Sequence, residues 1–199
     1  MSFGPDGVAS EQANDLVAVS RDEVENWRRT GLEVVPLTAF ARHILASQFP
    51  TEFDLTRVRL RSGGALWQTM KSLDTLFNRG RTAAMALGWS VLDLRPGRSI
   101  PGGFDQLNLH DLALLVHEIT HIVQQQHVGG LFPFLLRYAP EYSLGYEKNY
   151  GVKPFIESAH VPDSIIGIET IREFEGRRVT YDNIADLNRA IFLNRYGKR

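Results

Sequence analysis

The sequence predicts an α+β fold in which a small, mostly antiparallel sheet packs on a central helix, with further helices around it. Residues 55–61 and 84–94 have the patterns of strands, whereas apolar residues recur at helical spacing across 112–126. With 199 residues and 43% hydrophobic content, the chain can bury the core of one domain. We expect a flexible N-terminal lead over residues 1–20 and a single domain over 21–199.

The composition gives no indication of nucleic acid or membrane partners. The formal net charge is -1, and basic residues do not cluster. No signal peptide and no apolar run of membrane-spanning length is present. We therefore expect a cytoplasmic protein, with non-classical export left open. Because the chain has no cysteine, a metal site must use histidine and carboxylate ligands.

Residues 1–49 are expected to form a lead and two helices. Residues 1–20 are mostly small and polar, which favours a flexible segment. Ser20 and Glu23 form a capping-box pattern, which predicts a short helix over 20–29. Residues 37–49 follow as an amphipathic helix that ends at a proline.

The remaining elements surround the central helix. Residues 55–61 alternate apolar and charged side chains, as a half-buried strand does, and 84–94 forms the second strand. The other segments are predicted as follows: 65–77 helical or irregular, 99–106 a loop, 131–138 a short apolar helix or turn, and 182–195 a capped amphipathic helix.

The central helix carries the sequence His117-Glu118-Ile119-Thr120-His121, an H-E-x-x-H pattern. Asn108 is placed to cap its start, and a Gly129-Gly130 pair to end it. Histidines four residues apart lie on one face of a helix, where both imidazoles can bind one zinc ion. Glu118 can then act as general base toward a zinc-bound water. The simpler alternative is a pair of core histidines satisfied by hydrogen bonds.

A catalytic zinc site needs a third protein ligand, and four residues after the helix are candidates. Glu157 has apolar neighbours that suit an inward-facing carboxylate, and it is the preferred candidate. Glu173 is the second choice, although its charged surroundings are typical of a solvated face. His127 has the offset of the third histidine in the longer H-E-x-x-H-x-x-G-x-x-H pattern, but Gln124 replaces the glycine of that pattern. His160 is the fourth candidate, although a hydrogen-bond donor to one of the ligands, or a surface histidine, is its more usual role.

Residues 117–160 resemble a group of small bacterial metallopeptidase-like domains of unassigned function. The similar pieces are His117 to Gln124, Val128 to Tyr138, Gly145-Tyr146 and Pro154 to Ala159, and the weaker similarity extends over roughly residues 35–160. The resemblance implies a minimal zincin-like fold, with a small sheet beside the metal helix and a glutamate from a later helix as third ligand. The chain departs from the group at Ile156, where a glutamate is expected, with Glu157 one position later.

Together these features predict a zinc metallopeptidase whose zinc is bound by His117, His121 and Glu157, with a peptide or protein as substrate. Glu118 serves as the general base, and Tyr146 or Tyr150 could stabilise the oxyanion. Some similar domains are encoded beside contractile-injection or phage-tail-like systems, which implies by association a secretion-system component. Two alternatives remain: a zincin-fold binding or accessory protein with little turnover, and a structural metal site closed by a fourth ligand.

Overall fold

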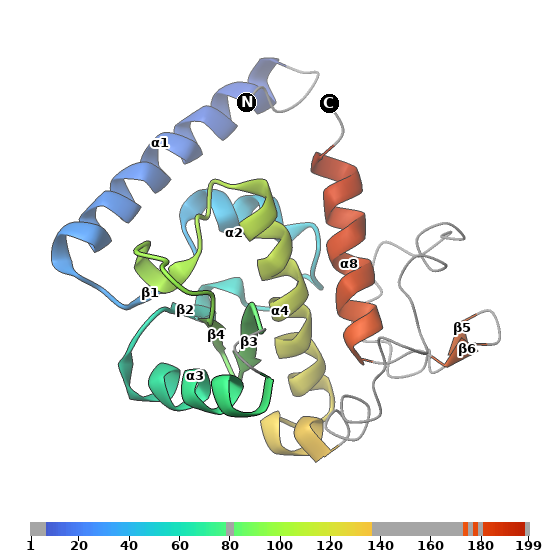
Figure 1. The fold of residues 1–199 in the computed structure, drawn as a ribbon. Helices are drawn as coiled ribbons and strands as arrows, with labels where there is room; N and C mark the ends of the chain where they lie inside the picture. The colour runs from blue at the N-terminus through green and yellow to red at the C-terminus, as the bar shows by residue number, and fades with distance from the viewer. Residues whose placement is uncertain (1–6, 79–81, 137–172, 175–176, 179–180, 198–199) are drawn as a thin grey trace.

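The computed structural model describes residues 7–78, 82–136, 173–174, 177–178 and 181–197, which form helices around a small sheet (Figure 1). This arrangement confirms the α+β class. None of the helices in these residues is both long and apolar enough to cross a membrane.

The first helix, α1 (Gly7–Thr30), begins much earlier than predicted. The expectation of a flexible lead over residues 1–20 is wrong from Gly7 onward. Ala13 and Trp27 of α1 are buried, and three partly buried apolar residues between them pack against the core: Leu16, Val17 and Val24. Most residues of this segment are small or polar, so its few apolar residues at helical spacing were not recognised as the buried face of a helix.

Side chains of α1 cap the second helix, α2 (Ala39–Ala46). Ser20 accepts a hydrogen bond from the backbone N–H of Phe40 at 2.9 Å, and Glu23 accepts one from that of Ala39 at 3.0 Å. These N–H groups lie in the first turn of α2, where no intrahelical acceptor exists. Ser20 and Glu23 thus cap a neighbouring helix instead of the start of their own.

The sheet consists of β1 (Val34–Pro36), β2 (Arg59–Arg61), β3 (Ala84–Leu87) and β4 (Ser90–Asp93) in the order β1-β2-β4-β3. The β1–β2 and β3–β4 pairs are antiparallel, and β2 and β4 are parallel. The prediction of a mostly antiparallel sheet is confirmed. Strand β3 forms one edge.

Both predicted strands differ from the observed ones in a specific way. Residues 84–94 form the hairpin β3–β4 instead of one strand, because Gly88 turns the chain with φ 56. Residues 55–61 are a strand only over β2. They begin as the 3-10 turn η1 (Leu55–Arg57), where Asp54 accepts a hydrogen bond from the N–H of Thr56.

Helix α3 (Gly64–Asn78) connects the central strand β2 to the edge strand β3 and confirms the helical prediction for residues 65–77. Its Trp67 donates from Nε1 to the backbone oxygen of Asp93 at 2.5 Å, and Lys71 donates to that of Leu94. These two bonds attach α3 to the end of β4.

A cluster of charged side chains fixes the loop that leads from β4 through the turn η2 (Pro101–Gly103) to the central helix, α4 (Leu109–His127). Arg95 donates to Asp93 at 2.8 Å and to Asp111 at 2.6 Å, and Arg98 also donates to Asp111. Burial by itself lowers the pKa of Arg95, but hydrogen bonds and charge from both aspartates outweigh this effect and raise that pKa above its ordinary value. The cluster anchors the first turn of α4 to the sheet.

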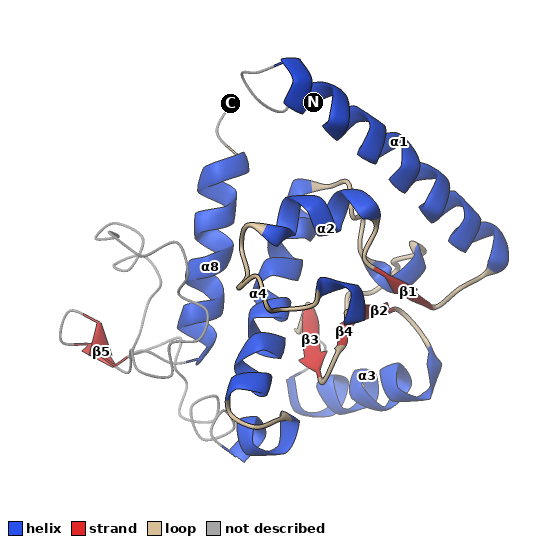
Figure 2. Ribbon diagram, turned by 180° about the vertical axis from the view of Figure 1, so that it is seen from behind, coloured by secondary structure: helices blue, strands red, loops and turns tan. Residues whose placement is uncertain are grey.

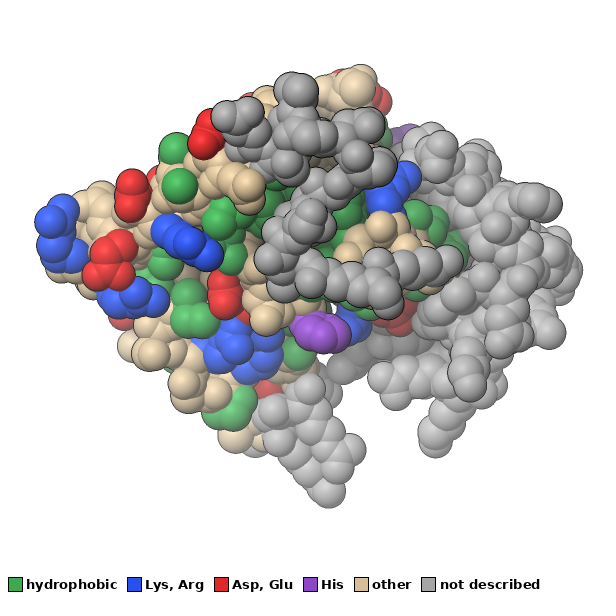
Figure 3. Space-filling model, turned by 90° about the horizontal axis from the view of Figure 1, so that it is seen from above, with side chains coloured by type: hydrophobic (Ala, Val, Ile, Leu, Met, Phe, Trp, Pro, Cys, Tyr) green, Lys and Arg blue, Asp and Glu red, His purple; other side chains and the backbone are tan. Residues whose placement is uncertain are grey.

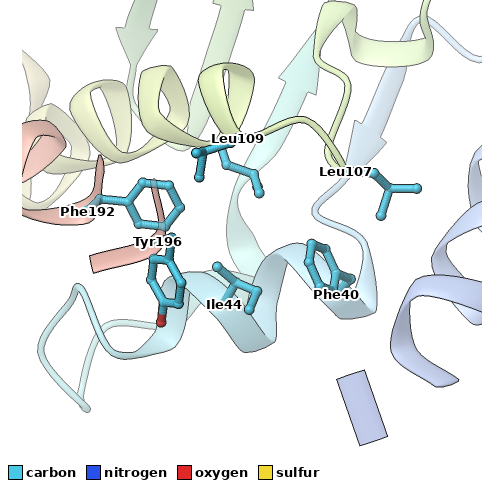
Figure 4. A pocket seen from close by; sticks show the side chains of 7 residues that line it. Phe40, Ile44, Leu107, Leu109, Phe192 and Tyr196 are labelled. Carbon is cyan, nitrogen blue, oxygen red and sulfur yellow. The ribbon is translucent and has the colours of Figure 1, made fainter. Parts of the chain in front are cut away.

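Helix α4 lies between the sheet and the C-terminal helix, α8 (Tyr181–Tyr196), as both views show (Figures 1 and 2). At the start of α4, these two helices and α2 enclose a small apolar pocket (Figure 4). The side chains labelled there are Phe40, Ile44, Leu107, Leu109, Phe192 and Tyr196. A short hairpin, β5 (Glu173–Phe174) with β6 (Arg177–Arg178), precedes α8 in the chain.

Acidic and basic side chains are interspersed on the face seen from above (Figure 3). This mixture agrees with the net charge near zero.

Candidate metal centre

The two histidines of the motif lie in the middle of a continuous helix. Asn108 caps α4, and its side chain accepts from the N–H groups of His110 at 2.9 Å and Asp111 at 3.3 Å, as predicted. The helix runs without a break to His127 and is followed by Gly129 and Gly130, which have φ 93 and 120. His117 and His121 are therefore held one helical turn apart.

The separation of the two imidazoles fits a shared ion. Zinc binds an imidazole nitrogen at about 2.0–2.1 Å, and that atom lies about 1.2 Å from the ring centre, so two rings on a tetrahedral ion have centres about 5 Å apart. The ring centres of His117 and His121 are 4.9 Å apart, and the rings meet edge-on at 84°. The donor set and its spacing therefore fit a zinc ion.

The Nδ1 atoms of both rings lie beside oxygen atoms. His121 Nδ1 is 2.8 Å from Oε1 of Gln124, one turn further along α4. His117 Nδ1 is 2.9 Å from Oδ1 of Asp186, which belongs to α8. The distance between His117 Nδ1 and Asp186 Oδ1 is that of an ion pair, but the geometry of this contact is not that of a hydrogen bond.

A hydrogen bond between two buried polar side chains fixes α8 against this part of α4. Asn188 donates to Oγ1 of Thr120 at 2.9 Å, and Thr120 donates to the backbone oxygen of Val116 at 2.7 Å. Both side chains are buried. Asp186 is thereby kept next to His117.

The centre is only partly accessible to solvent. Glu118 is 5% exposed and His121 is 6% exposed, whereas the side chain of His117 is 14% exposed. Phe134, within the helical residues 131–136, lies against His121 with ring centres 5.8 Å apart. This apolar neighbour shields one side of the ring, and burial strengthens electrostatic interactions at the site.

The structure does not bring a third ligand to the histidine pair within the residues it describes. In that part of the chain, no group of three or more His, Asp or Glu side chains could hold an ion. The predicted ligand Glu157 lies outside the described residues, as do His160, Tyr146 and Tyr150. Glu173 begins β5, where its side chain is not described.

The structure argues against His127 as the third ligand. It is exposed at the last residue of α4, and the helix has not bent after His121. At 100° per residue, six further residues turn His127 far from the face that His121 shares with His117.

Sequence reasoning missed the contact made by Asp186. This aspartate comes from a helix far along the chain, and only the packing of α8 on α4 brings it to His117. The one local signal was its position between Ile184 and Leu187, both buried, within the predicted amphipathic helix.

Comparisons with protein-family models, with curated proteins and with solved structures find no match to this chain. The resemblance to metallopeptidase-like domains therefore stays a prediction.

Proposed function

We propose that this chain is a zinc-dependent metallopeptidase in which His117 and His121 bind the ion and Glu118 is the general base. The main support is the imidazole pair, whose ring centres are 4.9 Å apart on one turn of a capped, buried helix.

Glu118 would transfer one proton during hydrolysis. When bound, zinc would act as a Lewis acid that lowers the pKa of water and polarises the peptide carbonyl. Glu118 takes a proton from the attacking water and gives it to the leaving amine, so that the peptide bond breaks as the new C–O bond forms. Glu118 is buried and directly follows the proposed ligand His117 in the sequence.

The sheet offers a place for an extended peptide. Strand β3 is an edge strand and contacts α4, so a peptide could add to it by β-pairing. The side chain of Gln125 already binds the carbonyl of Ala86 and the N–H of Gly88. A peptide would therefore pair nearer the Ala84 end of this strand.

The substitution Glu118→Gln tests the assignment of the base. It should leave zinc content unchanged and lower kcat/KM on a fluorescence-quenched peptide library by about 10²–10⁴-fold. Glu25→Gln is the matched control, because Glu25 is an exposed helical glutamate that pairs with Arg28. If Glu118→Gln cleaves at the wild-type rate, Glu118 is not the general base. If the wild type binds zinc but cleaves no peptide, the chain is not a peptidase.

The third ligand is tested by zinc content in two variants. Glu157→Ala should lose most of the bound zinc, whereas Glu173→Ala should keep it. The reverse result would assign the ligand to Glu173 and overturn the preference for Glu157.

A further inference from the structure

We propose that Asp186 and Gln124 are positioning residues of the metal centre, each of which sets the tautomer of one histidine through its Nδ1 atom. This inference rests on the proposed zinc site and adds two residues to it. Neither residue would touch the ion.

Gln124 acts on His121. An amide oxygen can only accept a hydrogen bond, so Nδ1 of His121 must donate to Oε1 of Gln124 across the observed 2.8 Å. A neutral imidazole protonated at Nδ1 carries its lone pair on Nε2. Both side chains are 6% exposed, so water competes little for this contact. Gln124 therefore favours the tautomer of His121 that binds metal through Nε2.

Asp186 has the equivalent position beside His117. Its Oδ1 lies 2.9 Å from Nδ1, and an ionised carboxylate is an acceptor only. A carboxylate on the outer nitrogen orients the ring and makes the inner nitrogen a stronger ligand.

The position of Asp186 argues against a role as the ion's third ligand. A carboxylate that binds the ion lies near Nε2 of its companion histidine, because that nitrogen faces the metal. Asp186 is instead beside Nδ1. The bond from Asn188 to Thr120 holds it there. The C-terminal helix α8 thus completes the metal centre without supplying a ligand.

Zinc affinity gives the first test, measured on the full chain by competition with a chromophoric chelator. Asp186→Ala and Gln124→Ala should each raise the Kd for zinc by about 10–100-fold. Asn194→Ala and Gln126→Ala are the matched controls, because they alter exposed residues of the same two helices and should leave the Kd unchanged. An unchanged Kd in both Asp186→Ala and Gln124→Ala would overturn the proposal.

The tautomers give a second test, which needs no metal. In the zinc-free protein at pH 8, where a free imidazole is neutral, ¹H–¹⁵N correlation of the rings should show both histidines protonated at Nδ1. Asp186→Asn keeps the shape but can donate as well as accept, so His117 should lose this preference while His121 keeps it. Protonation of the wild-type His117 at Nε2 would overturn the proposal. A wild type that binds no zinc but shows both Nδ1–H tautomers would refute the proposed function alone.

Discussion

The buried carboxylate of Asp111 joins three parts of the chain. It accepts hydrogen bonds from Arg95 and Arg98 of the loop after β4, and from the backbone N–H of Asp105 at 2.7 Å. It also lies in the first turn of α4, where a negative charge is favourable. One side chain thus fixes both the loop and the start of α4.

Asp111→Ala should lower the free energy of unfolding by about 3 kcal/mol, because two partly buried arginines lose a shared partner. Urea denaturation measures this loss. Glu25→Ala, which breaks an exposed ion pair, should cost less than about 1 kcal/mol in the same assay. Equal losses for the two variants would show that the cluster does not anchor α4.

Residues of the candidate site could be predicted from the sequence only where their spacing along one helix brings them together. His117, Glu118 and His121 follow from a short pattern on one helix, and the cap at Asn108 follows from the residue type. Gln124 was noticed only as a replaced glycine, although its spacing from His121 already placed the two on adjacent turns. Asp186 could not be predicted, because no local rule specifies which face of α8 meets α4.

At the scale of elements, Gln125 links α4 to the sheet edge. Its amide accepts from the N–H of Gly88 at 2.9 Å and donates to the carbonyl of Ala86 at 3.1 Å. A residue of a neighbouring parallel strand would pair with the same two groups. The side chain therefore replaces part of a fifth strand and holds β3 against α4.

Gln125→Ala should reduce stability by about 1–3 kcal/mol, since two backbone groups of the sheet edge lose their partners. The adjacent Gln126→Ala alters an exposed side chain and should change stability by less than about 0.5 kcal/mol. Urea denaturation of both variants measures their free energies of unfolding. Identical unfolding curves for the two variants would mean that the Gln125 amide contributes no net stability.

The predicted elements failed where short segments or tertiary contacts decided the structure. Strand β1 has three residues, including Pro36, and so carries too little periodicity to detect. Gly88 within an apolar run was a missed turn signal. The helical state of α1 depends on its packing against the core, which composition does not report. By contrast, α4 has strong periodicity, a cap and a stop, and was predicted well.

At the scale of the whole molecule, the proposed ion would connect folding to metal binding. The histidines belong to α4 and their neighbour Asp186 to α8, so the proposed site is complete only when these helices pack together. A ligand that binds only the folded chain stabilises it by mass action.

Zinc at a hundred times its Kd should therefore stabilise the protein by about 2.7 kcal/mol, which corresponds to a rise in Tm of roughly 5–10 °C for a chain of this size. Differential scanning calorimetry with and without zinc measures the shift. His121→Ala should show little or no rise. A wild-type Tm that is insensitive to zinc would argue against a folded-state site.

The most direct measurement of the central claim is the zinc content of the full chain after loading and exhaustive dialysis. Elemental analysis should find one zinc per chain in the wild type and in Glu118→Gln, and almost none in His117→Ala or His121→Ala. A wild type without zinc, or histidine variants that retain it, would contradict a metal centre at this helix.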